Sequence, residues 1–331
     1  MFGDSWRLLR DYFYDKNMHG VDWVAMFHKY RAFVDRCTHR EELDDVFKHM
    51  AAELSALHVF VYGGEYRPVS EDKRVLEGAE VGSLCVDASR TEEGYTVEHM
   101  YEIDPHFPTI DDKFRVVPLS HQFLRRTGQR GLRPGDRIVA IDGVPVLAVP
   151  DLNYLLTGKV NRGVKVDVKR ASGDSDVSSS VFTRAVSNRD CSDIKYASWE
   201  YRTRQKAVRL ASEAGFSMGY IHMRSMSGAA AEDQFVRGYF RDFDKQGMIV
   251  DVRDNRGGSI DSWLLDVFSK KAWMFWQSRT ANITNGGLGH DQLGAFMGAV
   301  VVLTNEQTAS DGEGFSRGMK TLGLAKLVGT R

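Results

Sequence analysis

The chain has 331 residues, of which 42% are hydrophobic and 27% are charged, and its formal net charge is −1. This length is enough for two or three domains with cores of their own, and the composition is typical of a soluble globular protein. A net charge close to zero produces no overall field that attracts nucleic acid or an acidic membrane, so we expect neither as a partner.

The cysteines and the apolar runs argue against several other classes. Cys37, Cys85 and Cys191 are far apart in the sequence, so we expect no disulfide framework, and their small number fits a reducing compartment. There is no C-x-x-C motif and no Cys/His spacing that suits zinc, so we expect no metal and no cofactor. No apolar run is long enough to span a membrane, and residues 1–20 lack the pattern of a signal peptide.

Residues 5–56 show the periodicity of helices. Apolar side chains recur at three- and four-residue steps, with a break at His19-Gly20, and a further stretch places five of them on one helix face. These five are Leu43, Val46, Phe47, Met50 and Leu54. We therefore predict a helical subdomain over residues 1–75.

Short apolar or alternating stretches between turn residues predict a β-rich domain over residues 76–188. Strands are expected in GSLCVDAS, GYTVEHMYEI, DRIVAIDGVPV and GVKVDVKR. Asp142-Gly143 is a typical two-residue hairpin turn between two of these strands.

The last part of the chain, residues 189–331, alternates strands and helices after a linking helix at about residues 197–212. MGYIHM, MIVDVR and VVVLTN have the composition of buried strands, and each is followed by a helical stretch. This alternation predicts a mainly parallel sheet, so the fold class is multidomain α+β with a β/α core. Functional groups in such sheets gather at the carboxyl ends of the strands, where two motifs lie.

The first of these motifs is TASDG, in which Ser310 follows a buried strand and begins a helix. Such a serine would present its hydroxyl above the sheet beside the backbone N–H of Asp311, as an acyl-transfer nucleophile and its oxyanion donor require. Ser310-x-x-Glu313 is also a capping box, in which the serine only satisfies the helix N-terminus. Taken alone, the local pattern favours capping.

RDNRGGS is the second motif. Gly257 and Gly258 follow a buried strand and would let the backbone approach a ligand with its N–H groups turned inward. A tight turn with positive φ is the commoner explanation of such a pair. Two loops of this kind at one edge of a sheet nevertheless suit the two sides of an oxyanion hole.

A general base is harder to select, because the chain has ten histidines. His19 lies at a helix break, whereas His28, His222 and His290 compete with it by residue type alone. His222 lies within a predicted strand, where we expect it to pack. Spacing distinguishes none of the acidic candidates for orienting the base, which are Asp22, Asp251, Asp254, Asp261 and Glu306.

Four motifs together resemble a known family. GLRPGDRIVAIDGVPV looks like the signature of PDZ domains attached to proteases, and MIVDVRDNRGG with LTNEQTASDGEGFS resembles the core of the C-terminal processing peptidases. WRLLRDYFYDKNMHGVDW and ELSALHVFVYGGEYR are similar to the tricorn protease family. The resemblance covers nearly the whole chain in the family's order, and it implies a PDZ-like domain followed by a crotonase/ClpP-like catalytic core.

The tricorn resemblance implies a serine peptidase that hydrolyses peptide bonds in oligopeptides, which are products of larger proteases. It implies Ser310 as nucleophile, His19 as general base, and the N–H of Asp311 with that of Gly257 or Gly258 as oxyanion hole. The helical subdomain would then have to deliver His19 to the core. Family members form homohexamers, archaeal ones in the cytosol and some bacterial ones after export. We therefore expect a homo-oligomer in the cytoplasm, with the periplasm as the alternative.

Two departures from the family pattern bear on activity. The residue before the histidine is a serine in the archaeal enzyme, where it joins a glutamate in a tetrad, and here it is Met18. The family's glutamate follows a G-T-R segment, whereas this sequence ends at Arg331, directly after a strand-like stretch. We therefore expect a fragment, truncated at the C-terminus, that lacks the orienting acid and the two preceding β-propellers and is inactive by itself.

A non-catalytic peptide-binding protein is the alternative function. A PDZ-like domain captures extended peptides by strand addition, and retinoid-binding proteins share the core fold without being peptidases. The presence of both the serine and the distant histidine favours the enzyme. A cofactor-binding α/β domain is excluded, because there is no G-x-G-x-x-G after the first strand and no P-loop lysine.

Overall fold

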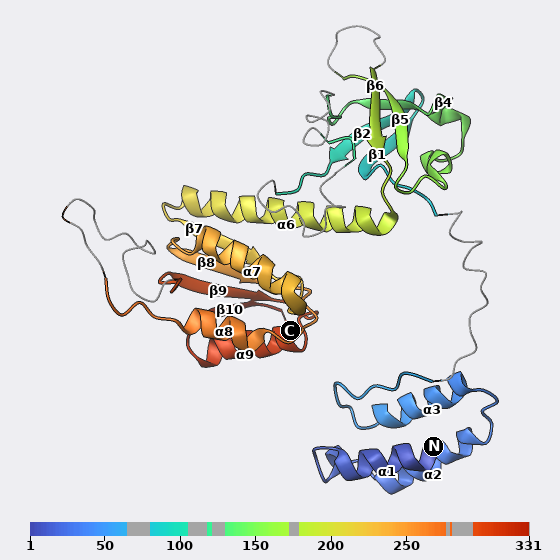
Figure 1. Ribbon diagram of the computed structural model, residues 1–331, viewed down its shortest axis with the longest axis vertical. Helices are drawn as coiled ribbons and strands as arrows, with labels where there is room; N and C mark the ends of the chain where they lie inside the picture. The colour runs from blue at the N-terminus through green and yellow to red at the C-terminus, as the bar shows by residue number, and fades with distance from the viewer. Residues whose placement is uncertain are drawn as a thin grey trace. The chain divides into compact units, whose positions relative to one another are not determined.

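A computed structural model describes residues 1–64, 80–104, 118–120, 130–171, 179–275, 279 and 294–330. The chain divides into two compact units, Met1–Gly78 and Ala79–Arg331. In Figure 1 the helices of the first unit are blue, and the second unit runs from cyan to red.

The first unit is helical, as the apolar periodicity predicts. Its helices are α1 (Phe2–Tyr12), α2 (Trp23–Val34) and α3 (Arg40–Ala52). A single 3₁₀ turn, Met18–Gly20, occupies the predicted break between α1 and α2. Left-handed backbone at Met18, His19 and Gly20 ends the helical path there, with φ angles of 50°, 55° and 80°.

Two tryptophans and an apolar core hold these helices together. The indole N–H of Trp6 donates to the Trp23 carbonyl at 2.7 Å, and that of Trp23 donates to the Trp6 carbonyl at 3.0 Å. This reciprocal pair fixes α1 against the start of α2. The buried core side chains are Phe2, Met18, Trp23, Tyr30, Phe47, Met50 and Leu54.

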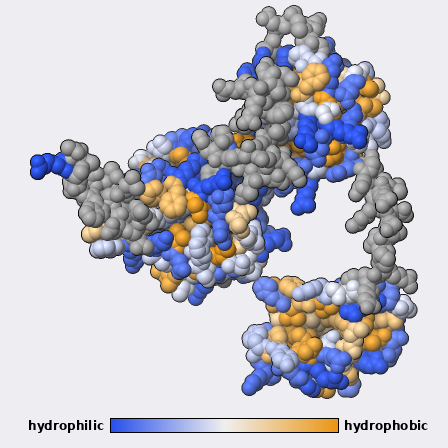
Figure 2. Space-filling model, viewed as in Figure 1, coloured by the Kyte–Doolittle hydropathy of each residue, from blue (hydrophilic) through white to orange (hydrophobic). Residues whose placement is uncertain are grey.

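Part of the apolar surface of the helical unit faces solvent. Figure 2 shows hydrophobic residues gathered on its visible face. The large exposed apolar side chains of the unit include Leu8, Val24, Phe33, Leu57 and Phe60. A unit of this size has a small interior, which leaves some apolar side chains outside it.

The second unit begins with an antiparallel sheet of six strands in the order β1-β2-β3-β5-β6, with β4 paired to β3. The strands are β1 (Val86–Thr91), β2 (Gly94–Met100), β3 (Arg137–Ile141), β4 (Val144–Pro145), β5 (Gly163–Lys169) and β6 (Ser179–Arg184). Asp142 and Gly143 form the predicted hairpin turn between β3 and β4, with φ angles of 49° and 82°. The β-rich prediction is confirmed at the level of the strands.

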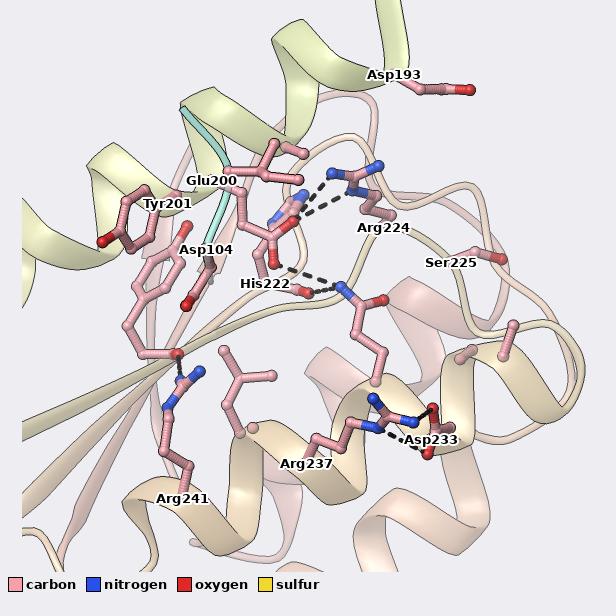
Figure 3. Close-up of a pocket in the computed structure, with 18 of the residues that line it drawn as sticks. Asp104, Asp193, Glu200, Tyr201, His222, Arg224, Ser225, Asp233, Arg237 and Arg241 are labelled. Carbon is pink, nitrogen blue, oxygen red and sulfur yellow. Dashed lines mark hydrogen bonds and ion pairs between the residues drawn. The ribbon is translucent and has the colours of Figure 1, made fainter. Parts of the chain in front are cut away.

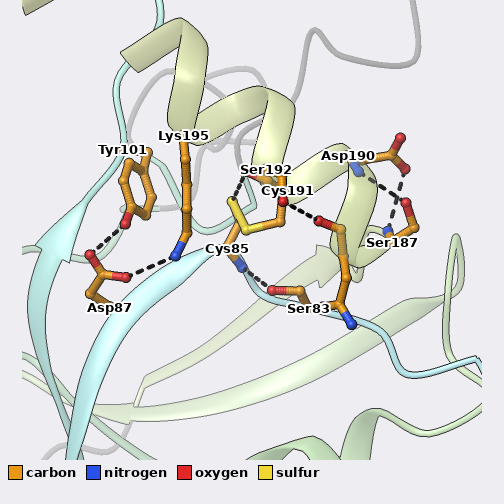
Figure 4. Close-up of a disulfide and its surroundings, with 10 residues drawn as sticks. Ser83, Cys85, Asp87, Tyr101, Ser187, Asp190, Cys191, Ser192 and Lys195 are labelled. Atoms are coloured by element: carbon orange, nitrogen blue, oxygen red, sulfur yellow. Dashed lines mark hydrogen bonds and ion pairs between the residues drawn. A yellow bond between two sulfur atoms is a disulfide. The ribbon is translucent and has the colours of Figure 1, made fainter. Parts of the chain in front are cut away.

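A disulfide joins Cys85, directly before β1, to Cys191 near the start of α6 (Asn188–Glu213), as Figure 4 shows. The two Cα atoms are 5.3 Å apart although the cysteines are 106 residues apart in the sequence. Our expectation from the separation of the cysteines was therefore wrong. The chain passes through the whole β-sheet and returns to Cys85 at α6, which sequence distance does not reveal. The pairing also removes the cysteine argument for a reducing compartment.

The predicted parallel sheet is present, in the order β10-β9-β8-β7. Its strands are β7 (Met218–His222), β8 (Gly247–Asp251), β9 (Ala299–Thr304) and β10 (Lys326–Gly329), and all pair in parallel. The helices that follow the first three strands are α7 (Gly228–Asp242), α8 (Asp261–Ser269) and α9 (Asp311–Thr321). The alternation of strands and helices thus appears where the sequence predicts it.

Helices cover this sheet and leave the carboxyl ends of the strands to the loops. α6 and α7 pack against β7, α9 packs against β9 and β10, and α8 packs against α9. The linking helix α6 has 26 residues and is longer than the stretch that the sequence predicts. Within the described residues, no helix has both the length and the apolar character needed to cross a membrane.

Candidate active site

Ser310 lies in the turn between β9 and α9, at the residue that precedes the first turn of the helix. Its backbone has φ 53° and ψ −122°, whereas a residue that only caps a helix has β-region angles. Glu313 accepts the backbone N–H of Ser310 at 2.8 Å, and the predicted capping box is present. Capping does not require the strained backbone. Such strain in a non-glycine residue is typical of functional sites, including nucleophile turns between a strand and a helix.

The two glycines after β8 have different roles. A Cβ atom placed on Gly257, where φ is +99°, would lie 2.6 Å from Cβ of Ser310 and 2.9 Å from the backbone N of Asp311. Gly257 therefore lies directly against the turn that carries Ser310, and only a residue without a side chain fits there. Gly258 lies against Met226 of the loop after β7, with which it forms a parallel bridge.

Hydrogen bonds distinguish the N–H groups at this turn. The N–H of Gly257 donates to the side-chain oxygen of Asn255 at 2.8 Å. The N–H groups of Gly258 and Asp311 make no hydrogen bond within the part of the chain that the structure describes. Each of the two loops thus has one backbone N–H without a hydrogen bond among the described residues.

The side chain of Asp311 links the two loops. Its Oδ2 atom accepts the N–H of Ile260 at 2.7 Å and that of Asp261 at 3.0 Å, which caps the start of α8. The residue that would supply one oxyanion donor therefore also holds the segment that follows the glycine pair.

Asn255 is fully buried, and three of its hydrogen bonds join it to the loops after β7, β8 and β9. Its side-chain amide donates to the Met223 carbonyl at 2.7 Å, its side-chain oxygen accepts from Gly257, and its backbone carbonyl accepts the N–H of Ala309 at 2.9 Å. The loops after β7, β8 and β9 meet at this residue. We did not select Asn255 from the sequence. Its position between a buried strand and two consecutive glycines is the sequence feature that could have indicated its role.

His19 belongs to the first unit, in the left-handed turn between α1 and α2. Its Nδ1 atom lies 2.7 Å from the Leu54 carbonyl, which follows the end of α3, and its backbone N–H donates to Asp15 Oδ2 at 2.9 Å. The Tyr14 hydroxyl contacts its Nε2 atom. Tyr14 and Asp15 were not selected from the sequence. The other four predicted site residues, Ser310, Asp311, Gly257 and Gly258, belong to two loops at one edge of the parallel sheet in the second unit.

The competing histidines have other environments. His222 is 1% exposed and packs within β7, as predicted, and its Nδ1–H donates to the Asp251 carbonyl at 3.0 Å. Burial lowers the pKa of His222 to about 4. His28 is exposed on α2, and His290 lies outside the described residues.

Most of the acidic candidates have structural partners. Asp251 is buried, and hydrogen bonds from Arg253 and Tyr220 outweigh the effect of its burial and hold its pKa below the usual range. Asp22 accepts the N–H of Ala25 at the start of α2. The remaining contacts join Asp254 to Asn305, Asp261 to the N–H of Ser262, and Glu306 to Thr330.

A cavity of about 400 Å³ lies elsewhere in the second unit, among α6, β7 and α7 (Figure 3). Glu200 and Arg224 form an ion pair of 3.2 Å across it, and Asp233 pairs with Arg237 at 2.9 Å. Burial raises the pKa of Glu200. None of the predicted site residues lines this cavity. The cavity nevertheless borders the loop that carries the two glycines, because Ser225, which lines the cavity, donates to the Gly257 carbonyl at 3.4 Å.

Two segments of the chain match known family models. Residues 1–52 match the family model of the tricorn protease C1 domain, and residues 217–331 match that of peptidase family S41. The parallel sheet and the Ser310 turn lie within the segment that matches the S41 model. Over its whole length, the chain is similar to the tricorn proteases.

The relatives are considerably longer than this chain. The tricorn protease of Thermoplasma volcanium is 26% identical over 331 residues, which are 100% of this chain and 29% of that protein. Tricorn protease homolog 1 of Streptomyces coelicolor is 28% identical over 334 residues, which cover 100% of this chain and 28% of the homolog. A crystal structure of the tricorn protease has a TM-score of 0.75 at 24% identity, covering 100% of this chain and 29% of its own, and it shows the same fold. The chain thus spans less than a third of these relatives.

Proposed function

We propose that the chain carries the catalytic groups of a serine peptidase, with Ser310 as nucleophile and His19 as general base. The observation that carries the proposal is the strained backbone of Ser310, together with one N–H group without a hydrogen bond among the described residues in each of the two loops, that of Asp311 and that of Gly258. Helix capping accounts for neither feature. Similarity to tricorn proteases and the family S41 match support the same activity.

The proposed reaction uses these groups in order. His19 Nε2 takes the proton of the Ser310 hydroxyl while the serine oxygen attacks the carbonyl carbon of the peptide bond. The resulting oxyanion accepts hydrogen bonds from the N–H groups of Asp311 and Gly258. His19 then gives the proton to the leaving amine, and water hydrolyses the acyl-enzyme by the same steps. The proposal requires His19 to come within hydrogen-bonding distance of Ser310.

Gly258 is the better oxyanion donor of the two glycines. The N–H of Gly257 already donates to Asn255 at 2.8 Å, and using it would leave a buried side-chain oxygen without that donor. Gly257 instead provides the space that the Ser310 side chain occupies. We assign Gly257 to the packing of the site and Gly258 to the oxyanion.

The imidazole of His19 does not depend on Met18 for its orientation. Met18 is 6% exposed and packs in the core of the helical unit, so it offers no polar replacement for a serine. The Leu54 carbonyl accepts from Nδ1 and thereby fixes the ring. A carboxylate supplied by further chain would add charge stabilisation to this arrangement.

We further propose three functional segments, residues 1–75, 76–188 and 189–331. The second would act as a PDZ-like domain that captures extended peptides by strand addition, and the third as a crotonase/ClpP-like catalytic core. A purely peptide-binding function is not favoured, because strand addition needs neither a strained serine nor a histidine. Oligopeptides are the proposed substrates, and a hexamer in the cytoplasm is the proposed state, by analogy with the tricorn family.

Labelling with a fluorophosphonate tests the activity directly. The 331-residue chain, and any longer form that contains it, would be treated with the probe, and the adduct would be located by mass spectrometry. In a longer form that supplies the orienting acid, we expect an adduct on Ser310 that is absent from Ser310→Ala and strongly reduced in His19→Ala, whereas the 331 residues alone should react weakly or not at all. Absence of labelling from every folded form would reject the peptidase in favour of peptide binding.

A further inference from the structure

Both ring nitrogens of His19 are engaged within the helical unit. Nδ1 lies 2.7 Å from the Leu54 carbonyl, and Nε2 contacts the Tyr14 hydroxyl. A carbonyl oxygen only accepts hydrogen bonds, so the proton of the neutral ring is on Nδ1 and the lone pair is on Nε2. The ring is therefore held as the tautomer that a general base needs, and the Tyr14 hydroxyl donates to its basic nitrogen.

Several contacts restrict movement of this ring. The Phe13 and His19 rings meet edge to face with centroids 5.0 Å apart, and the Tyr14 and His19 rings do so at 5.3 Å. Asp15 accepts the N–H groups of Asn17 and His19, both at 2.9 Å, which holds the left-handed turn in place. The same two N–H groups hold the pKa of the Asp15 carboxyl below its usual range.

Tyr14 differs from Phe13 and Asp15 because its exposed side chain can rotate away from His19. Its side chain is 79% exposed, and its only hydrogen bond among the described residues is the one to His19. Leu54, in contrast, is completely buried at the end of α3, so its carbonyl is fixed. One partner of the imidazole is thus permanent and the other is exchangeable.

We propose that Tyr14 is a positioning residue that caps Nε2 of His19 with its hydroxyl and must be displaced before His19 accepts a proton. This inference rests on the proposed function, in which the incoming group is the Ser310 hydroxyl. Tyrosine and serine both donate O–H to Nε2, so the exchange replaces one hydrogen bond by another of the same kind. The hydrogen bond from Tyr14 keeps the His19 ring in its orientation and occupies the Nε2 lone pair until the Ser310 hydroxyl replaces the Tyr14 hydroxyl.

The cap competes with any group that approaches Nε2. A hydrogen bond of this type contributes about 1 kcal/mol, which corresponds to about a fivefold change in a rate. Tyr14→Phe keeps the aromatic ring and removes the hydroxyl. Tyr12→Phe is the matched control, since Tyr12 is 82% exposed and has no contact with His19 among the described interactions.

Modification by diethyl pyrocarbonate tests the cap without relying on peptidase activity. The reagent acylates an unprotonated imidazole nitrogen, and mass spectrometry follows His19 separately from the other histidines. In the full chain we expect His19 to react about fivefold faster in Tyr14→Phe than in wild type or Tyr12→Phe, with His28 unchanged as an internal reference. Equal rates in the three proteins would overturn the proposal.

Fluorophosphonate labelling of the same variants separates this inference from the proposed function. Faster labelling of Ser310 in Tyr14→Phe supports displacement of the cap during catalysis, whereas slower labelling overturns it. If no variant is labelled but His19 still reacts faster with diethyl pyrocarbonate, the peptidase assignment fails and the Tyr14 cap stands.

Discussion

The buried side-chain oxygen of Asn255 accepts the N–H of Gly257 at 2.8 Å, and Gly257 lies against the turn that carries Ser310. The same residue receives the N–H of Ala309 on its backbone carbonyl and donates to the Met223 carbonyl. The loops that follow three strands of the parallel sheet are therefore held by one residue. A substitution at Asn255 should therefore disturb the positions of Ser310 and of the proposed oxyanion donors at the same time.

Asn255→Ala tests that relationship. The substitution leaves a buried N–H and a buried carbonyl without partners, so we expect a loss of about 2–4 kcal/mol in the free energy of unfolding and much slower labelling of Ser310. Asn305→Ala is the control, because Asn305 joins the same loops but is partly exposed and water can replace it. Urea unfolding of both variants gives the comparison. Equal losses would contradict the central position of Asn255.

Gly257→Ala should damage the site more than its backbone angle alone explains. The added Cβ would lie 2.6 Å from Cβ of Ser310, so we expect a loss of stability of about 2–4 kcal/mol and at least about tenfold slower labelling of Ser310. Gly215→Ala is the matched control, since φ is +85° and a Cβ there meets nothing within 4 Å. We expect it to cost about 1 kcal/mol without an effect on labelling. Similar behaviour of the two variants would refute the contact.

His222 makes the stability of the second unit depend on pH. Burial lowers the pKa of His222 from 6.5 to about 4, an effect that the neighbouring Asp251 only partly opposes. As pH falls from about 6.5 to about 4, the unfolded chain takes up this proton before the folded chain does, so stability falls by up to about 3 kcal/mol. Above pH 6.5 the full contribution is present. Urea unfolding at several pH values should show a shallower decline in His222→Gln than in wild type, and parallel curves would exclude the effect.

The disulfide predicts the number of accessible thiols. Cys85 and Cys191 are paired and Cys37 is free, so the unreduced, denatured chain should contain one reactive thiol and the reduced chain three. Reduction should lower the free energy of unfolding of the second unit by about 2–4 kcal/mol, because the bond closes a long loop. Cys37→Ser should leave this loss unchanged. Three reactive thiols before reduction would show that the pair is not formed.

Local sequence patterns were sufficient for the helices and strands. The steps of three and four residues before Leu54, and the apolar runs ahead of Ser310 and Gly257, follow directly from the geometry of helices and buried strands. The order of alternating elements also led to the parallel sheet, since crossovers of one hand leave few arrangements. For the same reason the two loops with Ser310 and Gly257 were expected at one edge.

Contacts between distant residues were not accessible in this way. Cys85 and Cys191 meet because the β-sheet returns the chain to α6, and the loops around Met223, Gly257 and Ala309 meet at Asn255. Neither result has a periodic signal in the chain. The sequence also left open capping or catalysis at Ser310, and the left-handed φ of 53° at that residue, which supports the proposed nucleophile, is likewise a property of the folded loop.

The sequence alone thus specified which elements form and which side chains are candidates for the chemistry, because periodicity and turn residues act over short distances. The folded chain decided which N–H groups remain available at Ser310 and which groups hold the ring of His19. Those properties depend on hydrogen-bond partners such as the Leu54 carbonyl, 35 residues from His19, and packing alone brings such partners together.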